Sequence, residues 1–169
     1  MDLGKHARRN RRAATRAGGF SLIELLIVVA IILIIAAIAL PNLIRSRISA
    51  NEASAVNSIR TMTTAAVTYG SQCPSVGYPA TIADMGPGGG GCTGGANILD
   101  DVLGVAAPIK AGYSFTYAPA ATGGLNTTYT LNANPINPGN SGQRGFYSDQ
   151  TGVIHYALTG PATVASSVL

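Results

Sequence analysis

The sequence lacks the motifs of the common enzyme classes. It contains no GxSxG, HExxH, CxxC or GxxxxGK[ST] pattern, and only two histidines and two cysteines. His6 falls in a basic N-terminal segment, and His155 stands beside Tyr156 in a strand-like stretch, where a sheet-surface histidine is more common than a catalytic base. We therefore expect no enzymatic activity, no catalytic residue and no cofactor.

Charge is also scarce once the N-terminal segment is set aside. Six of the eleven basic residues lie within residues 1–19, namely Lys5, Arg8, Arg9, Arg11, Arg12 and Arg16. The rest of the chain has five basic and six acidic residues, a formal charge of −1 before the termini are counted. A basic nucleic-acid-binding surface is therefore not expected beyond residue 19, and we expect no specific nucleic-acid partner.

A long apolar run, Phe20–Leu40, follows the basic segment and contains a single acid, Glu24. As a helix it would extend about 32 Å, enough to cross the roughly 30 Å hydrocarbon core of a bilayer. Dense positive charge next to such a run stays in the cytoplasm. The pattern predicts a single-pass precursor in a membrane, with a cytoplasmic leader and a translocated C-terminal part.

Small residues precede the apolar run here, whereas a secretory signal has its small-residue cleavage site after that run. Gly19 followed by Phe20-Ser21-Leu22-Ile23-Glu24 resembles the class III signal of type IV pilins and type II secretion pseudopilins. Pro41 matches the helix proline of that family, and Leu33 stands where many members have glycine. The resemblance covers roughly residues 19–46.

The resemblance implies a specific processing pathway. A prepilin peptidase would cleave between Gly19 and Phe20, remove the leader 1–19, and methylate the new amine of Phe20. It also implies a bacterial inner-membrane precursor, an assembly ATPase, a platform protein, and a final location in an extracellular pilus or a periplasmic pseudopilus. In the family, the acid equivalent to Glu24 is thought to pair with the N-terminal amine of a neighbouring subunit.

Elementary electrostatics supports that role for Glu24. A carboxylate inside a membrane helix is costly unless it has a partner, and an intramembrane acid is a functional-site hypothesis by default. A neighbour displaced along the axis would bring its Phe20 amine to Glu24 and so define subunit register. The alternative is a carboxylate that reaches the head groups from the helix end.

The helix is predicted to continue beyond the apolar run. Residues 20–44 have no water-soluble face, whereas residues 45–70 are amphipathic and stop near Gly70. Their apolar stripe consists of Ile44, Ile48, Ala55, Ile59, Met62, Ala66 and Tyr69, with Val56, Thr63 and Val67 alongside. Pro41 predicts a kink, which is either a tolerated feature of a membrane helix or a hinge.

Residues 71–169 are predicted to form one small head. Candidate strands cover residues 112–118 and 127–133, and a hairpin joins residues 145–148 to 153–156 around a glycine-containing turn. A short helix is expected over residues 97–103, residues 71–95 are expected to be loop, and the tail from Pro161 is either a last strand or a frayed end. The fold class is α+β: a long helix packed on an antiparallel meander of three to four strands.

Cys73 and Cys92 are the two cysteines, both in the part predicted to be translocated. Outside the cytosol such a pair is most simply a disulfide. A metal site is the alternative, but no other cysteine or histidine lies at ligand spacing nearby, so we expect no bound metal.

Three further patterns are weak. Gly86, Gly88 and Gly91 satisfy GxGxxG, but no strand precedes them, so we interpret them as loop. Asp100-Asp101 is either a calcium ligand pair or, more commonly, a solvated face. Asn126-Thr127-Thr128 fits a short glycosylation pattern.

The sequence therefore favours a major-pilin-like subunit that forms a homo-oligomeric helical filament. One alternative keeps the family and changes the assembly, to a type II secretion pseudopilin or a minor pilin. A more distant one is a monomeric, signal-anchored binding domain, in which Glu24 would have no assembly role. A membrane-tethered hydrolase is weak, since no site for it is evident.

Overall fold

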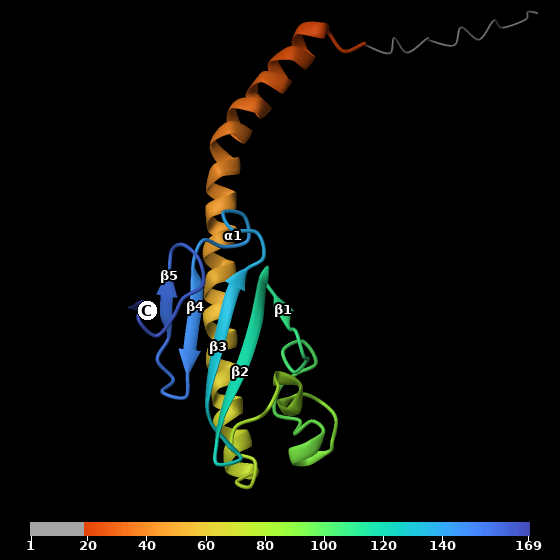
Figure 1. Ribbon diagram of the computed structural model, residues 1–169. Coiled ribbons are helices and arrows are strands. Elements are labelled where there is room, and N and C mark those ends of the chain that lie inside the picture. Colours follow the sequence, from red (N-terminus) through yellow and green to blue (C-terminus); the bar gives the residue numbers. More distant parts are fainter. Residues whose placement is uncertain (1–18) are drawn as a thin grey trace, which may run out of the picture. The chain divides into compact units, whose positions relative to one another are not determined.

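The computed structural model describes residues 19–169, so the leader predicted over 1–19 lies outside the described residues except for Gly19. One long helix, α1 (Leu22–Gln72), is followed by two short 3-10 turns and a six-stranded sheet (Figure 1). By their internal contacts the residues form two units, which divide between Ala39 and Leu40.

The first part of α1 leaves its apolar side chains uncovered. Within residues 22–39 every large hydrophobic side chain is exposed, from 80% for Leu22 to 46% for Val29. This part of α1 is long and apolar enough to cross a membrane, and none of its most apolar window is buried. The apolar, membrane-length helix predicted from the sequence is therefore present. Helix α1 continues through Pro41, and the kink predicted there stays a prediction.

The second part of α1 buries one stripe. Of the predicted stripe, Ile48, Ala55, Ile59, Met62, Ala66 and Tyr69 are buried. Ile44 and Val67 are exposed, so the prediction was wrong for these two. The helix ends at Gln72 rather than Gly70, and the Cys73 N–H donates to the carbonyl of Tyr69 at 2.8 Å. Gly70 is thus absorbed into the last turn, because the backbone bonds continue past it.

The sheet is an antiparallel meander in which each strand pairs with the next along the chain (Figure 1). Its strands are β1 (Ile109–Lys110), β2 (Tyr113–Thr122), β3 (Leu125–Pro135), β4 (Gly145–Asp149), β5 (His155–Ala157) and β6 (Ser167–Val168). The α+β class is confirmed, in an arrangement like that of type IV pilins. The strand count exceeds the predicted three to four, because β1 and β6 have only two residues each and show no alternation.

Alternation positions the sheet over the helix. Tyr113 and Phe115 of β2 and Tyr129, Leu131 and Ala133 of β3 are buried. They pack in one core with Phe146 of β4 and the buried side chains of α1. Because successive strand residues face opposite sides, this pattern places one sheet face on the helix and leaves the other toward solvent.

Two segments differ from the prediction. The expected helix over residues 97–103 is absent: Asp101–Leu103 form a turn, and Asn97 has a positive φ of 55°. The Asp100 side chain accepts from the Leu103 N–H at 2.8 Å, a local bond that competes with helix formation. In the hairpin, β5 begins at His155, since Val153 belongs to the connection.

Residues 71–95 are largely loop, with 3-10 turns η1 (Ile82–Met85) and η2 (Gly91–Thr93). A Cβ added to Gly86 would overlap the carbonyl of Gly104. Glycine at position 86 therefore allows the backbone near Gly86 to pack closely against the backbone near Gly104, which agrees with the loop interpretation.

Candidate functional site

The predicted processing site lies just ahead of α1. Gly19, Phe20 and Ser21 are outside the helix, and Gly19 has no other atoms near the position of a Cβ. The Phe20 side chain is 81% exposed. A peptidase needs an accessible backbone outside a helix at the bond it cuts, and the Gly19–Phe20 bond meets this requirement. Cleavage there and methylation of Phe20 stay predictions.

Glu24 begins the helix with a specific contact. Its Oε2 accepts a hydrogen bond from the Ser21 N–H at 2.9 Å, and the Leu25 N–H donates to the Ser21 carbonyl at 3.2 Å. Ser21 is thus the N-cap and Glu24 the third helical residue, so the carboxylate makes one arm of a capping box. Its charge also lies at the positive end of the helix dipole.

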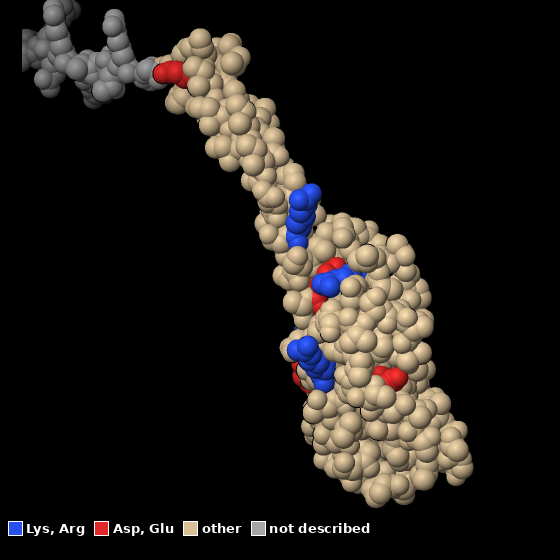
Figure 2. All heavy atoms as spheres, turned by 90° about the vertical axis from the view of Figure 1, so that its left-hand side faces the viewer, with Lys and Arg blue, Asp and Glu red and all other residues tan. Residues whose placement is uncertain are grey.

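Sequence reasoning missed this capping contact, although Ser21-Leu22-Ile23-Glu24 has the S-x-x-E spacing that signals it. The contact leaves Glu24 exposed and uses one of its two oxygens. No charged residue occurs between Glu24 and Arg45, and Figure 2 shows this part of α1 without red or blue atoms beyond its first turn. Glu24 is therefore the only carboxylate in the apolar run.

The disulfide prediction is confirmed. Cys73 and Cys92 are bonded, with their Cα atoms 5.7 Å apart, so the end of α1 is tied to η2. The Tyr69 hydroxyl donates to the Cys92 carbonyl at 2.7 Å and ties the same two segments a second time. Closing a loop of nineteen residues contributes about 3 kcal/mol by the chain-entropy account.

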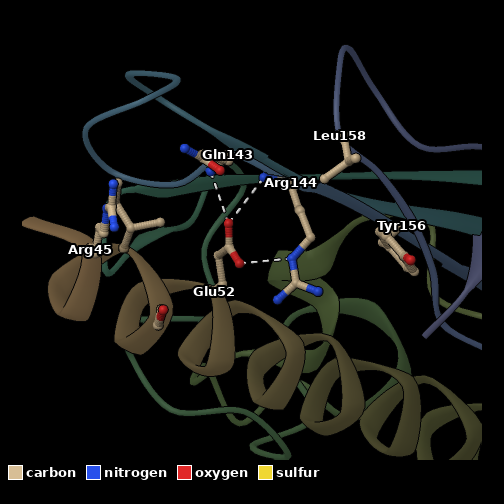
Figure 3. Close-up of a pocket in the computed structure, with 8 residues that line it drawn as sticks. Arg45, Glu52, Gln143, Arg144, Tyr156 and Leu158 are labelled. Atoms are coloured by element: carbon tan, nitrogen blue, oxygen red, sulfur yellow. Dashed lines mark hydrogen bonds and ion pairs between the residues drawn. The ribbon is translucent and has the colours of Figure 1, made fainter.

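The structure also contains a buried ion pair that the sequence reasoning missed. Glu52 lies on the buried face of α1 and is 6% exposed. Its Oε2 accepts from Arg144 Nε at 2.8 Å, and its Oε1 accepts from the backbone N–H groups of Gln143 and Arg144 at 2.9 and 3.1 Å (Figure 3). An acid four residues after Ile48 and three before Ala55, on the apolar stripe, was the available signal.

This contact sets the electrostatics of Glu52. Burial alone would raise the pKa of its carboxyl group, but the hydrogen bonds from Gln143 and Arg144 outweigh burial and hold the pKa below its ordinary value. The Arg144 guanidinium also lies 5.6 Å from the Phe146 ring centre and 5.5 Å from that of Tyr156. The cation is therefore held by aromatic faces as well as by the acid.

The weaker predicted sites have structural explanations. His155 Nδ1 lies 2.8 Å from the Ser166 carbonyl, which makes this histidine part of the β5–β6 edge. Asn126 Nδ2 donates to the Tyr78 carbonyl at 2.9 Å. Asp100 caps a turn, and Asp101 is exposed. Within residues 19–169 no group of three or more His, Cys, Asp or Glu side chains could hold a metal ion.

Comparison with known proteins bears on the N-terminal segment. Residues 15–40 match the family model described as the prokaryotic N-terminal methylation motif. No curated protein and no solved structure matched the chain. The match covers the predicted cleavage site and the apolar run, and ends one residue before Pro41. Residues 15–40 therefore carry the class III signal segment characteristic of type IV pilins and pseudopilins, and this segment together with the apolar helix fits a membrane-anchored precursor.

Proposed function

We propose that the chain is the major structural subunit of a type IV pilus, processed by a prepilin peptidase and assembled through the first part of α1. The observation that best supports this proposal is the apolar surface of residues 22–39, which no other described part of the chain covers. This surface begins beside the accessible Gly19–Phe20 bond. In this role the protein is structural and not an enzyme.

Cleavage would change the charge at the start of the helix. In the precursor, Glu24 accepts a hydrogen bond from Ser21, one residue beyond Phe20. After cleavage the methylated amine of Phe20 is a cation in the same apolar surroundings. Glu24 of one subunit and the amine of a displaced neighbour then neutralise each other, and neither charge is left alone at low dielectric.

Burial of the apolar surface does not by itself drive assembly. Before assembly, residues 22–39 of each subunit are already surrounded by lipid hydrocarbon. Their transfer into a helix bundle therefore gains van der Waals packing between helices rather than a large hydrophobic free energy. The ion pair adds specificity of register. An energy source is therefore needed, and we assign it to the ATPase and platform protein that pilin-type precursors use.

The direct test is N-terminal sequencing and intact-mass analysis of the protein in sheared cell-surface fibres. We expect abundant long fibres of a chain that begins with methylated Phe20. A fibre protein that retains residues 1–19 would overturn the proposal. Processed chain found only in short periplasmic fibres would replace it with the pseudopilin assignment, and processed chain at a few copies per fibre would replace it with a minor-pilin role.

A further inference from the structure

A trough on the head, about 480 Å³ in volume, lies between α1 and the chain leading into β4 (Figure 3). All of its residues belong to the unit that begins at Leu40. They combine two arginines and one acid with neutral polar and aliphatic side chains. Among them are Arg45, Ile48, Glu52, Gln143, Arg144 and Leu158.

The trough carries one positive charge that the head does not neutralise. Both carboxylate oxygens of Glu52 already accept hydrogen bonds, from Arg144 Nε and from the backbone of Gln143 and Arg144. The Arg45 side chain is exposed and has no ion pair or hydrogen bond with any residue from 19 to 169. Leu158, also in the lining, is 67% exposed. The trough therefore suits a partner that presents a carboxylate beside an apolar side chain.

A turn on the same head, residues 100–105, has this complementary character. Asp101 and Val102 are both exposed, Val102 by 45%. The other acids of residues 40–169 each accept at least one hydrogen bond within the chain. Asp101 has no ion pair or hydrogen bond from its side chain to any described residue. It is therefore the one acid of the described head that is left without a partner, and it stands next to an exposed valine.

The base of the turn is firmly held. Asp100 Oδ1 accepts from the Leu103 N–H at 2.8 Å, and the Gly104 N–H donates to the Asp100 carbonyl at 2.8 Å. Leu103 is buried in the core, and a Cβ added to Gly104 would overlap a neighbouring backbone segment. A partner therefore meets Asp101 and Val102 in a fixed arrangement, so that little conformational entropy is lost on contact.

The trough and the turn lie at different levels of the head. The trough includes Glu52 of α1, whereas Ile98, just before the turn, lines a hollow with Thr64. Glu52 and Thr64 are twelve residues apart, about 18 Å of helix. Figure 1 shows the chain near residue 100, in green, toward the end of the head at which α1 stops and away from the start of β4. Two different surfaces of one molecule make a head-to-tail contact, the kind that builds rings or helical filaments.

We infer that the turn of one copy, residues 100–105, occupies the trough of a second copy in the assembled fibre. The Asp101 carboxylate pairs with Arg45 of the other copy, and Val102 lies against Leu158. This inference rests on the proposed function, because it names a contact between heads that the fibre makes in addition to the Glu24 pair.

The first test uses the scarcity of lysine. Once residues 1–19 are removed, Lys110 is the only lysine of the chain. Arg45→Lys keeps the positive charge and places an amine in the trough, which a carbodiimide joins to a carboxylate in direct contact. We expect treated Arg45→Lys fibres to give covalent multimers beyond those of the natural chain, with residue 45 joined to Asp101 in peptide mass spectra. Arg47→Lys is the matched control, because Arg47 is exposed on the same helix and does not line the trough.

A charge exchange provides a second readout. Arg45→Glu and Asp101→Arg should each lower the yield of sheared fibres about tenfold, because each brings like charges together at the contact. The double variant should recover to within about threefold of the natural chain, and Arg47→Glu alone should lower the yield less than about twofold. Unchanged thermal unfolding of each variant in detergent shows that the head is still folded.

The failure of this contact is distinguishable from the failure of the proposed function. Fibres in which residue 45 joins no other copy, or a double variant as poor as the single ones, would overturn the contact and leave the fibre role intact. Equal multimers from Arg45→Lys and Arg47→Lys, or residue 45 joined to a different protein, would also overturn the contact. Fibres whose chains retain residues 1–19 but carry the link to Asp101 would overturn the proposed function and support the contact. A chain found only as a monomer would overturn both.

Discussion

The two parts of α1 differ in what covers them, although they are one helix. Residues 22–39 expose every large hydrophobic side chain, whereas the part beyond residue 47 buries a stripe of residues against the sheet. Both parts are helical, so the difference between them is not one of secondary structure. The difference teaches that the first part requires an environment outside the monomer, lipid or other copies, and that the second part is stabilised by its own head.

The polar groups of the two parts differ in the same way. Glu24 is exposed and bonded to a local backbone N–H, and its proposed final partner belongs to another molecule. Glu52 is buried and bonded to residues about ninety positions away in the same chain. The first acid is available for assembly, and the second serves the fold of the head.

The largest expected effect is on Glu24. Glu24→Ala should reduce sheared surface fibres about tenfold or more, because it leaves the amine of a neighbour unpaired at low dielectric, at a cost of several kcal/mol. The thermal stability of the head should not change. Ser21→Ala is the control, since Ser21 contributes only its backbone N–H and carbonyl to the contacts at this end. Normal fibre yield with Glu24→Ala would contradict the comparison.

A matched pair of isoleucines tests the two parts directly. Ile59 is 0% exposed and Ile35 is 61% exposed. Ile59→Ala should lower the free energy of unfolding of the head by about 3 kcal/mol, because it leaves a cavity in the core. Ile35→Ala should change it by less than about 0.5 kcal/mol. Thermal or urea unfolding of the full chain in detergent, followed by near-ultraviolet circular dichroism, measures both. Equal destabilisation would show that the two parts unfold as one unit.

The disulfide should contribute a similar amount to the head alone. Replacing Cys73 and Cys92 together by serine should lower the free energy of unfolding by about 3 kcal/mol, the loop-closure contribution for a loop of this size. Membrane insertion of residues 22–39 should be unaffected, which carbonate extraction of membranes would check. A loss of insertion would contradict the separation between the two parts.

The smallest effect, and the one that depends on pH, is expected for Glu52. The hydrogen bonds from Gln143 and Arg144 hold the folded-state pKa of Glu52 below its ordinary value of 4.5, so the unfolded chain binds the proton more tightly. The contribution of the carboxylate is therefore complete above about pH 4.5 and is lost as pH falls through the lower, folded pKa. Glu52→Gln should reduce stability by about 2 kcal/mol at pH 7 and by less at pH 3.

Urea unfolding at both pH values measures this effect. Asp101→Asn is the control, because Asp101 is exposed and no ion pair involves it within residues 19–169. That variant should differ from the natural chain by less than about 0.5 kcal/mol at either pH. A Glu52→Gln difference that is the same at pH 3 and pH 7 would show that the charge of Glu52 is not what stabilises the contact.

Much of this molecule follows from local pattern. The apolar run, the amphipathic stripe, the β2–β3 and β4–β5 hairpins and the disulfide were predictable, because periodicity, turn residues and cysteine context act over short distances. The predicted helix at residues 97–103 failed for a local reason as well, since the Asp100 side chain accepts the N–H of Leu103. The apolar residues of this segment suggested a helix, and they gave no sign that the Asp100 side chain would compete for the backbone N–H of Leu103.

Long-range contacts were not accessible in the same way. No pattern in the chain indicates that Glu52 meets Arg144, or that Arg45, Arg144 and Leu158 line one trough, because each pairing depends on how β4 and β5 register against α1. The chain's amino-acid order was sufficient for membrane anchoring, the processing motif and the α+β class, which depend on composition and spacing. The placement of charges on the head required the packed fold, because folding alone brings residues about ninety positions apart within hydrogen-bond distance.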